Sequence, residues 1–354
     1  MVELGKNGEH GGSRHAVHTS PLLDQQPVLS LRDLQVTFRG TSGPVPAVNG
    51  VTLEAHAGQV VAIVGESGSG KSATALASMG LLPDSATVTG SVLVEGTDLN
   101  AIPEKQRVPL RGSSIAMIFQ DALAALNPYR TVGRQIIDAY RLHHDVDKRT
   151  ARERAVEVLD RVGIRDATRR VDDYPHEFSG GMRQRAMIAM AVVNDPTILI
   201  ADEPTTALDV TVQRQVLDLL TGLTDDLGMA LVLITHDLGV VAEVADQIAV
   251  MYAGRIVESG SVLDIFDHPA HPYTQALLGA TPNLETSGRL AAIPGVPASG
   301  TNLPSGCPFH PRCAFAAEVG EACRTKRPVL ELRPGTPAHR AACHFTTDRE
   351  LPDA

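Results

Sequence analysis

Residues 59–72 read Gln-Val-Val-Ala-Ile-Val-Gly-Glu-Ser-Gly-Ser-Gly-Lys-Ser, and this stretch decides the fold. Gln59 to Val64 is a short apolar run typical of a buried parallel strand, and an Ala-rich segment with helical character follows. Between them, Gly65 to Ser72 match the pattern G-x-x-x-x-G-K-[ST], which binds phosphate where it joins a strand to a helix. The sequence therefore predicts an α/β domain that binds a nucleotide.

Each residue of this loop has an expected role. Glycines allow the backbone N–H groups to face phosphate oxygens, and the start of the helix adds positive potential. We expect Lys71 to reach the β- and γ-phosphates of ATP and Ser72 to bind Mg²⁺. The remaining residues of the predicted ATP-binding loop are Gly65, Glu66, Ser67, Gly68, Ser69 and Gly70.

A second motif, Ile-Leu-Ile-Ala-Asp-Glu at 198–203, is an apolar strand that ends in two acids. Asp202 is expected to hold Mg²⁺ through its water shell. Glu203 is expected to polarise the water that attacks the γ-phosphorus. The two motifs together predict an ATPase that needs ATP and Mg²⁺.

Composition limits the class of protein. Of the 354 residues, 43% are hydrophobic but only 3% are aromatic, so Ala, Val, Leu and Ile must build the core, as in a buried parallel sheet. The net charge of −10 argues against a protein that holds nucleic acid by general electrostatics. The sequence contains neither an apolar run of about 20 residues that could cross a bilayer nor an N-terminal signal peptide. We therefore expect a cytoplasmic protein.

The pattern along the chain predicts three regions. Residues 1–27 are polar and aperiodic, which indicates a flexible N-terminal extension. Residues 28–278 form the predicted nucleotide-binding domain. Alternating apolar residues after Val28 indicate an antiparallel β subdomain, and the spacing of apolar residues from about 122 to 193 indicates a helical subdomain. Residues 279–354 are rich in Pro, Gly, Cys and His, which predicts a small loop-rich C-terminal extension.

Phe-Ser-Gly-Gly-Met-Arg-Gln-Arg at 178–185 resembles the signature motif that defines ABC ATPases. The resemblance implies a P-loop NTPase core with antiparallel β and helical subdomains. It also implies that Ser179, Gly180 and Gly181 bind the γ-phosphate of a nucleotide held by an opposite subunit. The motif usually has Gln at its fifth position, where this chain has Met182, but the Ser and Gly donors are intact.

Further positions match the same family. Gln120 matches the Q-loop residue that contacts Mg²⁺ and the attacking water, His236 the switch histidine that contacts the γ-phosphate, and Asp209 the D-loop residue at the dimer interface. Phe38 matches an aromatic residue that stacks on adenine. It also continues the apolar face of Leu34, so a core role is equally open.

Three stretches are similar to the ATPases of oligopeptide/dipeptide importers: 120–129 (Gln-Asp-Ala-Leu-Ala-Ala-Leu-Asn-Pro-Tyr), 271–278 (His-Pro-Tyr-Thr-Gln-Ala-Leu-Leu) and 304–313 (Pro-Ser-Gly-Cys-Pro-Phe-His-Pro-Arg-Cys). The similarity implies a peripheral subunit on the cytoplasmic face of the inner membrane that hydrolyses ATP to power peptide uptake. Its implied partners are two integral membrane permease subunits, a second and related ATPase, and indirectly an extracytoplasmic substrate-binding protein. Nickel importers share this architecture and are the alternative. Soluble ABC ATPases of DNA repair or the ribosome fit less well, because they carry long coiled-coil insertions or a duplicated domain.

The four cysteines, Cys307, Cys313, Cys323 and Cys343, follow the spacing C-x5-C-x9-C-x19-C. Clustered thiols in a reducing compartment suggest metal ligation more than disulfides. Four thiolates suit either a [4Fe–4S] cluster or Zn²⁺, and free thiols are a third reading. Some oligopeptide-importer ATPases carry a [4Fe–4S] cluster at such cysteines, so the resemblance favours iron–sulfur.

Overall fold

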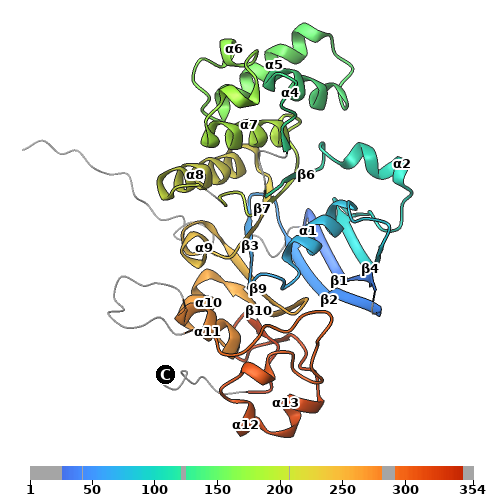
Figure 1. The fold of residues 1–354 in the computed structure, drawn as a ribbon, viewed down its shortest axis with the longest axis vertical. Coiled ribbons are helices and arrows are strands. Elements are labelled where there is room, and N and C mark those ends of the chain that lie inside the picture. The colour runs from blue at the N-terminus through green and yellow to red at the C-terminus, as the bar shows by residue number, and fades with distance from the viewer. Residues whose placement is uncertain (1–25, 42, 121–124, 207, 281–291, 346–354) are drawn as a thin grey trace, which may run out of the picture.

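A computed structural model describes residues 26–41, 43–120, 125–206, 208–280 and 292–345. Most of the expected N-terminal extension and residues 121–124, which follow Gln120, lie outside the described residues. Figure 1 shows a helical part at the top, two sheets in the middle and a loop-rich C-terminal part at the bottom.

A sheet of eight strands forms the centre, in the order β11-β12-β10-β9-β3-β8-β7-β6. The strands β6, β7, β8, β3 and β9 run parallel, and the other three continue the sheet antiparallel. Their bounds are β3 (Val60–Val64), β6 (Ile115–Ile118), β7 (Ile198–Asp202), β8 (Ala230–Thr235), β9 (Gln247–Tyr252), β10 (Arg255–Ser261), β11 (Glu331–Leu332) and β12 (Arg340–Ala341). Every residue of β3, β7 and β8 is buried, and the first two confirm the strands predicted from short apolar runs.

The two faces of the central sheet belong to two hydrophobic clusters. In β3, alternate residues point to opposite faces, so Val60 and Val64 join the cluster beneath the helices while Val61 and Ile63 join the cluster beneath a second sheet. That second sheet is antiparallel, in the order β2-β1-β4-β5, with β1 (Leu29–Gly40), β2 (Gly43–Ala55), β4 (Ala86–Val94) and β5 (Thr97–Asp98). Helix α1 (Lys71–Met79) contacts strands of both sheets.

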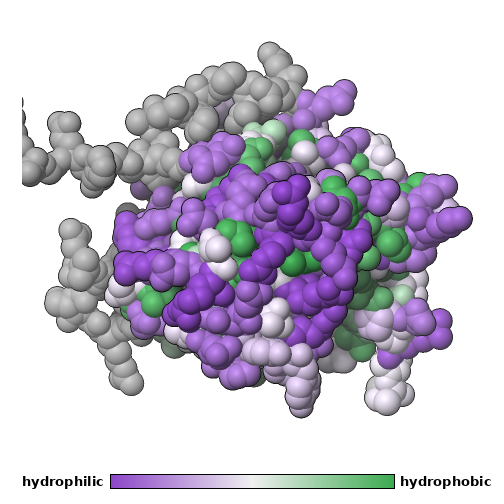
Figure 2. Space-filling model, turned by 90° about the horizontal axis from the view of Figure 1, so that it is seen from above, coloured by the Kyte–Doolittle hydropathy of each residue, from purple (hydrophilic) through white to green (hydrophobic). Residues whose placement is uncertain are grey.

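Helices cover the other face and form the upper part of Figure 1. The upper helices are α4 (Val132–Arg141), α5 (Lys148–Arg161), α6 (Ala167–Arg170) and α7 (Gly180–Val192). Those beside the sheet are α8 (Val210–Leu227), α9 (Leu238–Val244), α10 (Val262–Asp267) and α11 (Pro272–Gly279). Seen from above, the helical end is mostly hydrophilic with small hydrophobic areas between (Figure 2). None of the helices in the described part of the chain is long and apolar enough to span a membrane.

Short elements also occur outside these layers. They are α2 (Glu104–Arg107), the 3₁₀ turns η3 (Val108–Leu110), η4 (Pro175–Glu177) and η5 (His310–Arg312), and the C-terminal helices α12 (Ala316–Val319) and α13 (Glu321–Thr325).

The C-terminal extension is joined to the central sheet. Its strand β12 pairs with β10, where Glu258 faces Ala341 and Ser259 faces Arg340, and β11 pairs with β12 in turn. An open edge of a sheet leaves backbone N–H and C=O groups unpaired, and β12 pairs with those of β10. The small second unit expected from composition is thus continuous with the main sheet.

Candidate nucleotide-binding and hydrolysis site

The phosphate loop lies between β3 and α1 and has a backbone conformation that favours glycine at three positions. Gly65, Gly68 and Gly70 all have positive φ, at 153°, 77° and 106°. A Cβ on Gly65 would lie 2.1 Å from the carbonyl oxygen of Met251, and one on Gly70 would lie 2.4 Å from that of Ala47. The loop therefore packs backbone against backbone, and its shape is set by neighbours before any ligand binds.

The other loop residues differ in exposure. Ser67 and Gly68 are exposed, Glu66 is half-buried and Ser69 is buried. The Ser69 hydroxyl has no hydrogen-bond partner among the described residues. No side chain caps the start of α1 at Lys71. The loop consequently offers backbone N–H groups and a hydroxyl to an anion.

Lys71 is buried within the loop. Its Nζ donates to the carbonyl oxygens of Gly65 at 2.7 Å and Glu66 at 3.0 Å. Burial lowers its pKa, while nearby carboxylates, of which Glu203 acts most strongly, oppose the shift. Anionic oxygens are better partners for an ammonium group than carbonyl oxygens, so a bound phosphate can take over these hydrogen bonds.

Ser72 and Asp202 meet at the end of β7. Asp202 is 5% exposed, a hydrogen bond from the nearby Ser72 hydroxyl acts to lower its pKa, and its Oδ1 atom has no hydrogen-bond partner in the described part of the chain. Burial raises the pKa of Asp202, because the carboxylate loses solvation, and the charge of Glu203 adds to this. A hydroxyl oxygen beside an unpartnered carboxylate oxygen fits Mg²⁺, which prefers oxygen ligands.

Two of the predicted catalytic residues contact the carboxylate of the third. Glu203 Oε2 accepts a hydrogen bond from Gln120 Nε2 at 2.9 Å, and its Oε1 lies 3.4 Å from His236 Nδ1. Thr206, which was not predicted from the sequence, donates its hydroxyl to Glu203 Oε2 at 2.9 Å. The backbone of Glu203 has φ 47°, a strained value for a residue other than glycine, and its N–H donates to Ile234. The carboxylate is thus held in place and can accept a proton from water.

The signature residues lie away from this site. Ser179 caps α7, accepting from the N–H of Met182 at 3.3 Å, and Gly180 and Gly181 form its first turn. Asp209 caps α8 in the same way. Figure 1 shows α7 in the upper, helical part of the molecule and α1 beside the antiparallel sheet. One chain therefore does not bring its signature residues to its own phosphate loop.

Phe38 lies on β1 and is half-buried. It packs against the cluster beneath the antiparallel sheet, so it has the core contact that the sequence left open. Its half-exposed ring can still stack on a base, and that role stays a prediction.

The C-terminal extension contacts the phosphate loop, which the sequence did not predict. Arg312 in η5 pairs with the Glu66 carboxylate through two hydrogen bonds, of 2.6 and 3.0 Å. The Tyr273 hydroxyl accepts from the Glu66 N–H at 2.9 Å. Both side chains come from stretches that look like importer motifs, but the separation of 246 residues between Arg312 and Glu66 carries no local signal.

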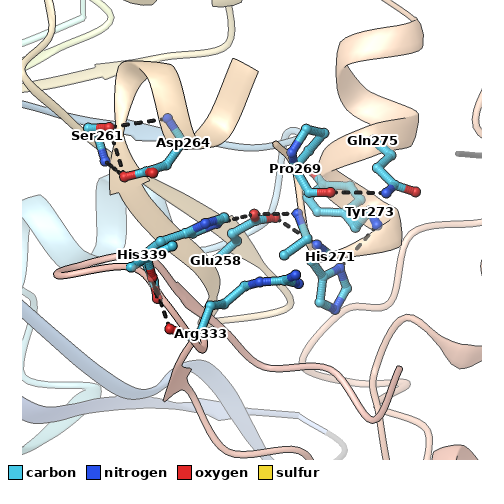
Figure 3. Close-up of polar contacts among 11 residues, drawn as sticks. Glu258, Ser261, Asp264, Pro269, His271, Tyr273, Gln275, Arg333 and His339 are labelled. Atoms are coloured by element: carbon cyan, nitrogen blue, oxygen red, sulfur yellow. Dashed lines mark hydrogen bonds and ion pairs between the residues drawn. The ribbon is translucent and has the colours of Figure 1, made fainter. Parts of the chain in front are cut away.

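A second buried contact fastens the extension. Glu258 on β10 is fully buried and accepts from the N–H groups of Ala270 at 2.6 Å and His271 at 2.9 Å, and His339 Nε2 lies 2.7 Å from its Oε1 (Figure 3). His339 belongs to the extension, so one carboxylate ties three segments together.

The four cysteines do not support the metal centre expected from their spacing. All are free, and burial raises the pKa of Cys307 to about 11 and that of Cys343 to about 12, with smaller contributions from the other thiols. Within the described ranges, no group of three or more His, Cys, Asp or Glu residues is arranged to hold a metal ion. These pKa values belong to thiols without a metal, because a bound metal ion would deprotonate its thiol ligands.

Comparison with known families matches two parts of the chain. Residues 48–206 match the ABC transporter family, and residues 257–319 match the C-terminal region of oligopeptide/dipeptide transporters.

The curated relatives include proteins named oligopeptide transport ATP-binding protein OppD, of which two are described. The protein from Mycobacterium tuberculosis is 51% identical over 320 residues, and the match covers 90% of this chain and 52% of the relative. The chain thus spans about half the length of that relative. The protein from Escherichia coli K12 is 48% identical over 320 residues, covering 90% of this chain and 94% of the relative.

Solved structures are similar over the nucleotide-binding part. The ATP-binding cassette MJ0796, solved as a dimer bound to ADP and Pi, is 26% identical with a TM-score of 0.59, covering 66% of this chain and 98% of the other. The protein cbiO1 from Clostridium perfringens, part of the ABC transporter complex cbiONQ, is 27% identical with the same TM-score, covering 69% of this chain and 92% of the other.

Proposed function

Because this chain belongs to the ABC transporter family of ATP-binding proteins, we propose that it is the ATP-hydrolysing subunit of a peptide importer. The observation that carries the proposal is the convergence of Gln120, Thr206 and His236 on the Glu203 carboxylate, next to the pair of Ser72 and Asp202. This arrangement can activate water beside a phosphate-binding loop.

The residues act together as follows. The loop from Gly65 to Ser72 binds the phosphates through backbone N–H groups, and Lys71 moves its hydrogen bonds from loop carbonyls to phosphate oxygens. Ser72, Asp202 and Gln120 hold Mg²⁺, which neutralises phosphate charge when bound. Glu203 accepts a proton from the attacking water, and His236 contacts the γ-phosphate.

The functional unit contains two ATPase subunits. Ser179, Gly180 and Gly181 start a helix that is remote from the phosphate loop of their own chain, so they are free to contact the nucleotide of a second subunit. Asp209 lies at the same interface, and Phe38 stacks on adenine. The dimeric state of the similar cassette bound to ADP and Pi supports this arrangement.

Peptide is the cargo that the relatives favour, since both OppD proteins are named for oligopeptide transport. The subunit then works on the inner face of the membrane with two permease subunits, a related second ATPase and, indirectly, a substrate-binding protein. Uptake of labelled peptides should be lost in a strain that lacks this gene, while uptake of Ni²⁺ should be unchanged. The reverse result would assign the chain to nickel import.

Replacing Glu203 by glutamine tests the catalytic role. The variant should hydrolyse ATP about 10²- to 10⁴-fold more slowly, because the water loses its base, yet bind ATP as the wild type does. Glu153→Gln is the control, since Glu153 is exposed on α5 and pairs only loosely with Arg149. Hydrolysis that is unchanged in Glu203→Gln would show that another group accepts the proton.

A metal at the four cysteines stays a prediction from the sequence, without support from the geometry. If a [4Fe–4S] cluster binds, anaerobically purified protein should be brown and contain four irons, as expected for four thiolate ligands. Bound zinc in colourless protein would favour Zn²⁺ instead, and metal-free protein would leave four free thiols.

A further inference from the structure

Arg312 is a buried cation that is fully positioned by the protein. Its side chain is 3% exposed and donates to the carbonyl oxygen of Pro294 at 2.8 Å. Its guanidinium lies 5.8 Å from the centre of the Tyr252 ring and 5.9 Å from that of Phe309. Its two terminal nitrogens bind both oxygens of Glu66, and they also donate to the Tyr252 hydroxyl at 3.4 Å and to the carbonyl oxygen of Ile293 at 3.5 Å. A guanidinium held on all sides presents a fixed positive charge to that carboxylate.

Glu66 is the second residue of the phosphate loop, so its charge lies where ATP phosphates are expected. Its carbonyl oxygen accepts from Lys71 Nζ at 3.0 Å, and its carboxylate acts electrostatically on the same ammonium group. The carboxylate side chain is 24% exposed, so solvent screens it only in part. An unpaired Glu66 would repel the phosphates and compete with them for Lys71.

We propose that Arg312 is a positioning residue of the nucleotide site, which neutralises Glu66 and holds it away from Lys71 so that the loop accepts phosphate. The inference rests on the proposed function, because it concerns ATP binding at that loop. It makes the C-terminal extension a working part of the nucleotide site. The extension supplies the charge that an acidic residue in the loop requires.

The rival explanation is that Arg312 only anchors the extension. A double substitution separates the two, because removing the Glu66 charge should make Arg312 dispensable for ATP binding but cannot restore its hydrogen bond to Pro294. The experiment measures the Kd of trinitrophenyl-ATP by fluorescence titration of the full chain. The variants are Arg312→Met, Glu66→Gln and the two combined.

Arg312→Met should weaken ATP-analogue binding about tenfold, because the unpaired Glu66 carboxylate would repel the phosphates and solvent screens that repulsion only in part. In the Glu66→Gln background, Arg312→Met should change the Kd by less than about threefold, because the charge that it would leave unpaired is already absent. Arg324→Met is the matched control, because Arg324 is an exposed arginine of the same extension, and it should leave the Kd unchanged.

Two results would overturn the inference: Arg312→Met with wild-type affinity, or a double variant as weak as Arg312→Met. If Arg312→Met does not fold by circular dichroism, Arg312→Lys replaces it, since lysine keeps the charge but not the two-point contact. Its affinity should fall about threefold and be restored by Glu66→Gln, and a lack of restoration would again overturn the inference. Wild-type protein that fails to bind the analogue would refute the proposed function itself, so the two failures are distinguishable.

Discussion

Glu258 joins the C-terminal extension to the main sheet, and replacing it by glutamine measures how much that junction stabilises the fold. The carboxylate is fully buried and makes contacts of 2.6, 2.9 and 2.7 Å with Ala270, His271 and His339. Glutamine has the same size, but its NH₂ group must face one of these donors and its charge is lost. A buried donor that is left without its acceptor costs about 1–3 kcal/mol. We expect the free energy of unfolding to fall by that amount.

The assay is urea denaturation at neutral pH, followed by circular dichroism. Glu243→Gln is the control, because Glu243 pairs with Arg214 at 3.0 Å on the surface, where their side chains are 51% and 64% exposed. An exposed pair contributes at most about 1 kcal/mol, so the control should unfold close to the wild type. A Glu258→Gln variant as stable as the control would refute the view that this carboxylate fastens the extension.

Three further predictions concern single residues. Burial lowers the pKa of His271 from 6.5 to about 4. Below pH 6.5 the unfolded chain therefore binds a proton at His271 while the folded chain does not, so the free energy of unfolding falls until the pH reaches about 4. His271→Asn keeps a cap for α11 and should reduce this loss in Tm-versus-pH curves; an unchanged slope would contradict the assignment. Gly65→Ala should abolish ATP binding because of the 2.1 Å contact, whereas Gly68→Ala, with nothing within 4 Å, should retain measurable binding in the same titration. Thr206→Val should lower ATP turnover about tenfold by removing a charged hydrogen bond, without changing ATP affinity; full turnover would show that Thr206 is dispensable.

Local sequence determined the elements that carry the site. The apolar runs at β3 and β7 are continuous, without alternating polar residues, because both faces of each strand are buried, and this pattern can be recognised from the sequence alone. The glycines of the phosphate loop were identified from their spacing, since the conformation they permit is a property of a few consecutive residues. The signature motif at 178–185 was identified by resemblance, which also indicated the ABC fold that the comparisons support.

Only the tertiary structure decided which distant side chains meet. Gln120 reaches the Glu203 carboxylate across 83 residues, whereas Thr206 reaches it within a local turn after β7. Arg312 reaches Glu66 across 246 residues, and β12 pairs with the edge of β10. The spacing of apolar residues along the sequence indicates which face of one helix or strand is buried. A contact between distant elements depends instead on how the whole chain is packed. For this reason the sequence predicted the phosphate loop but not the arginine that neutralises its acid.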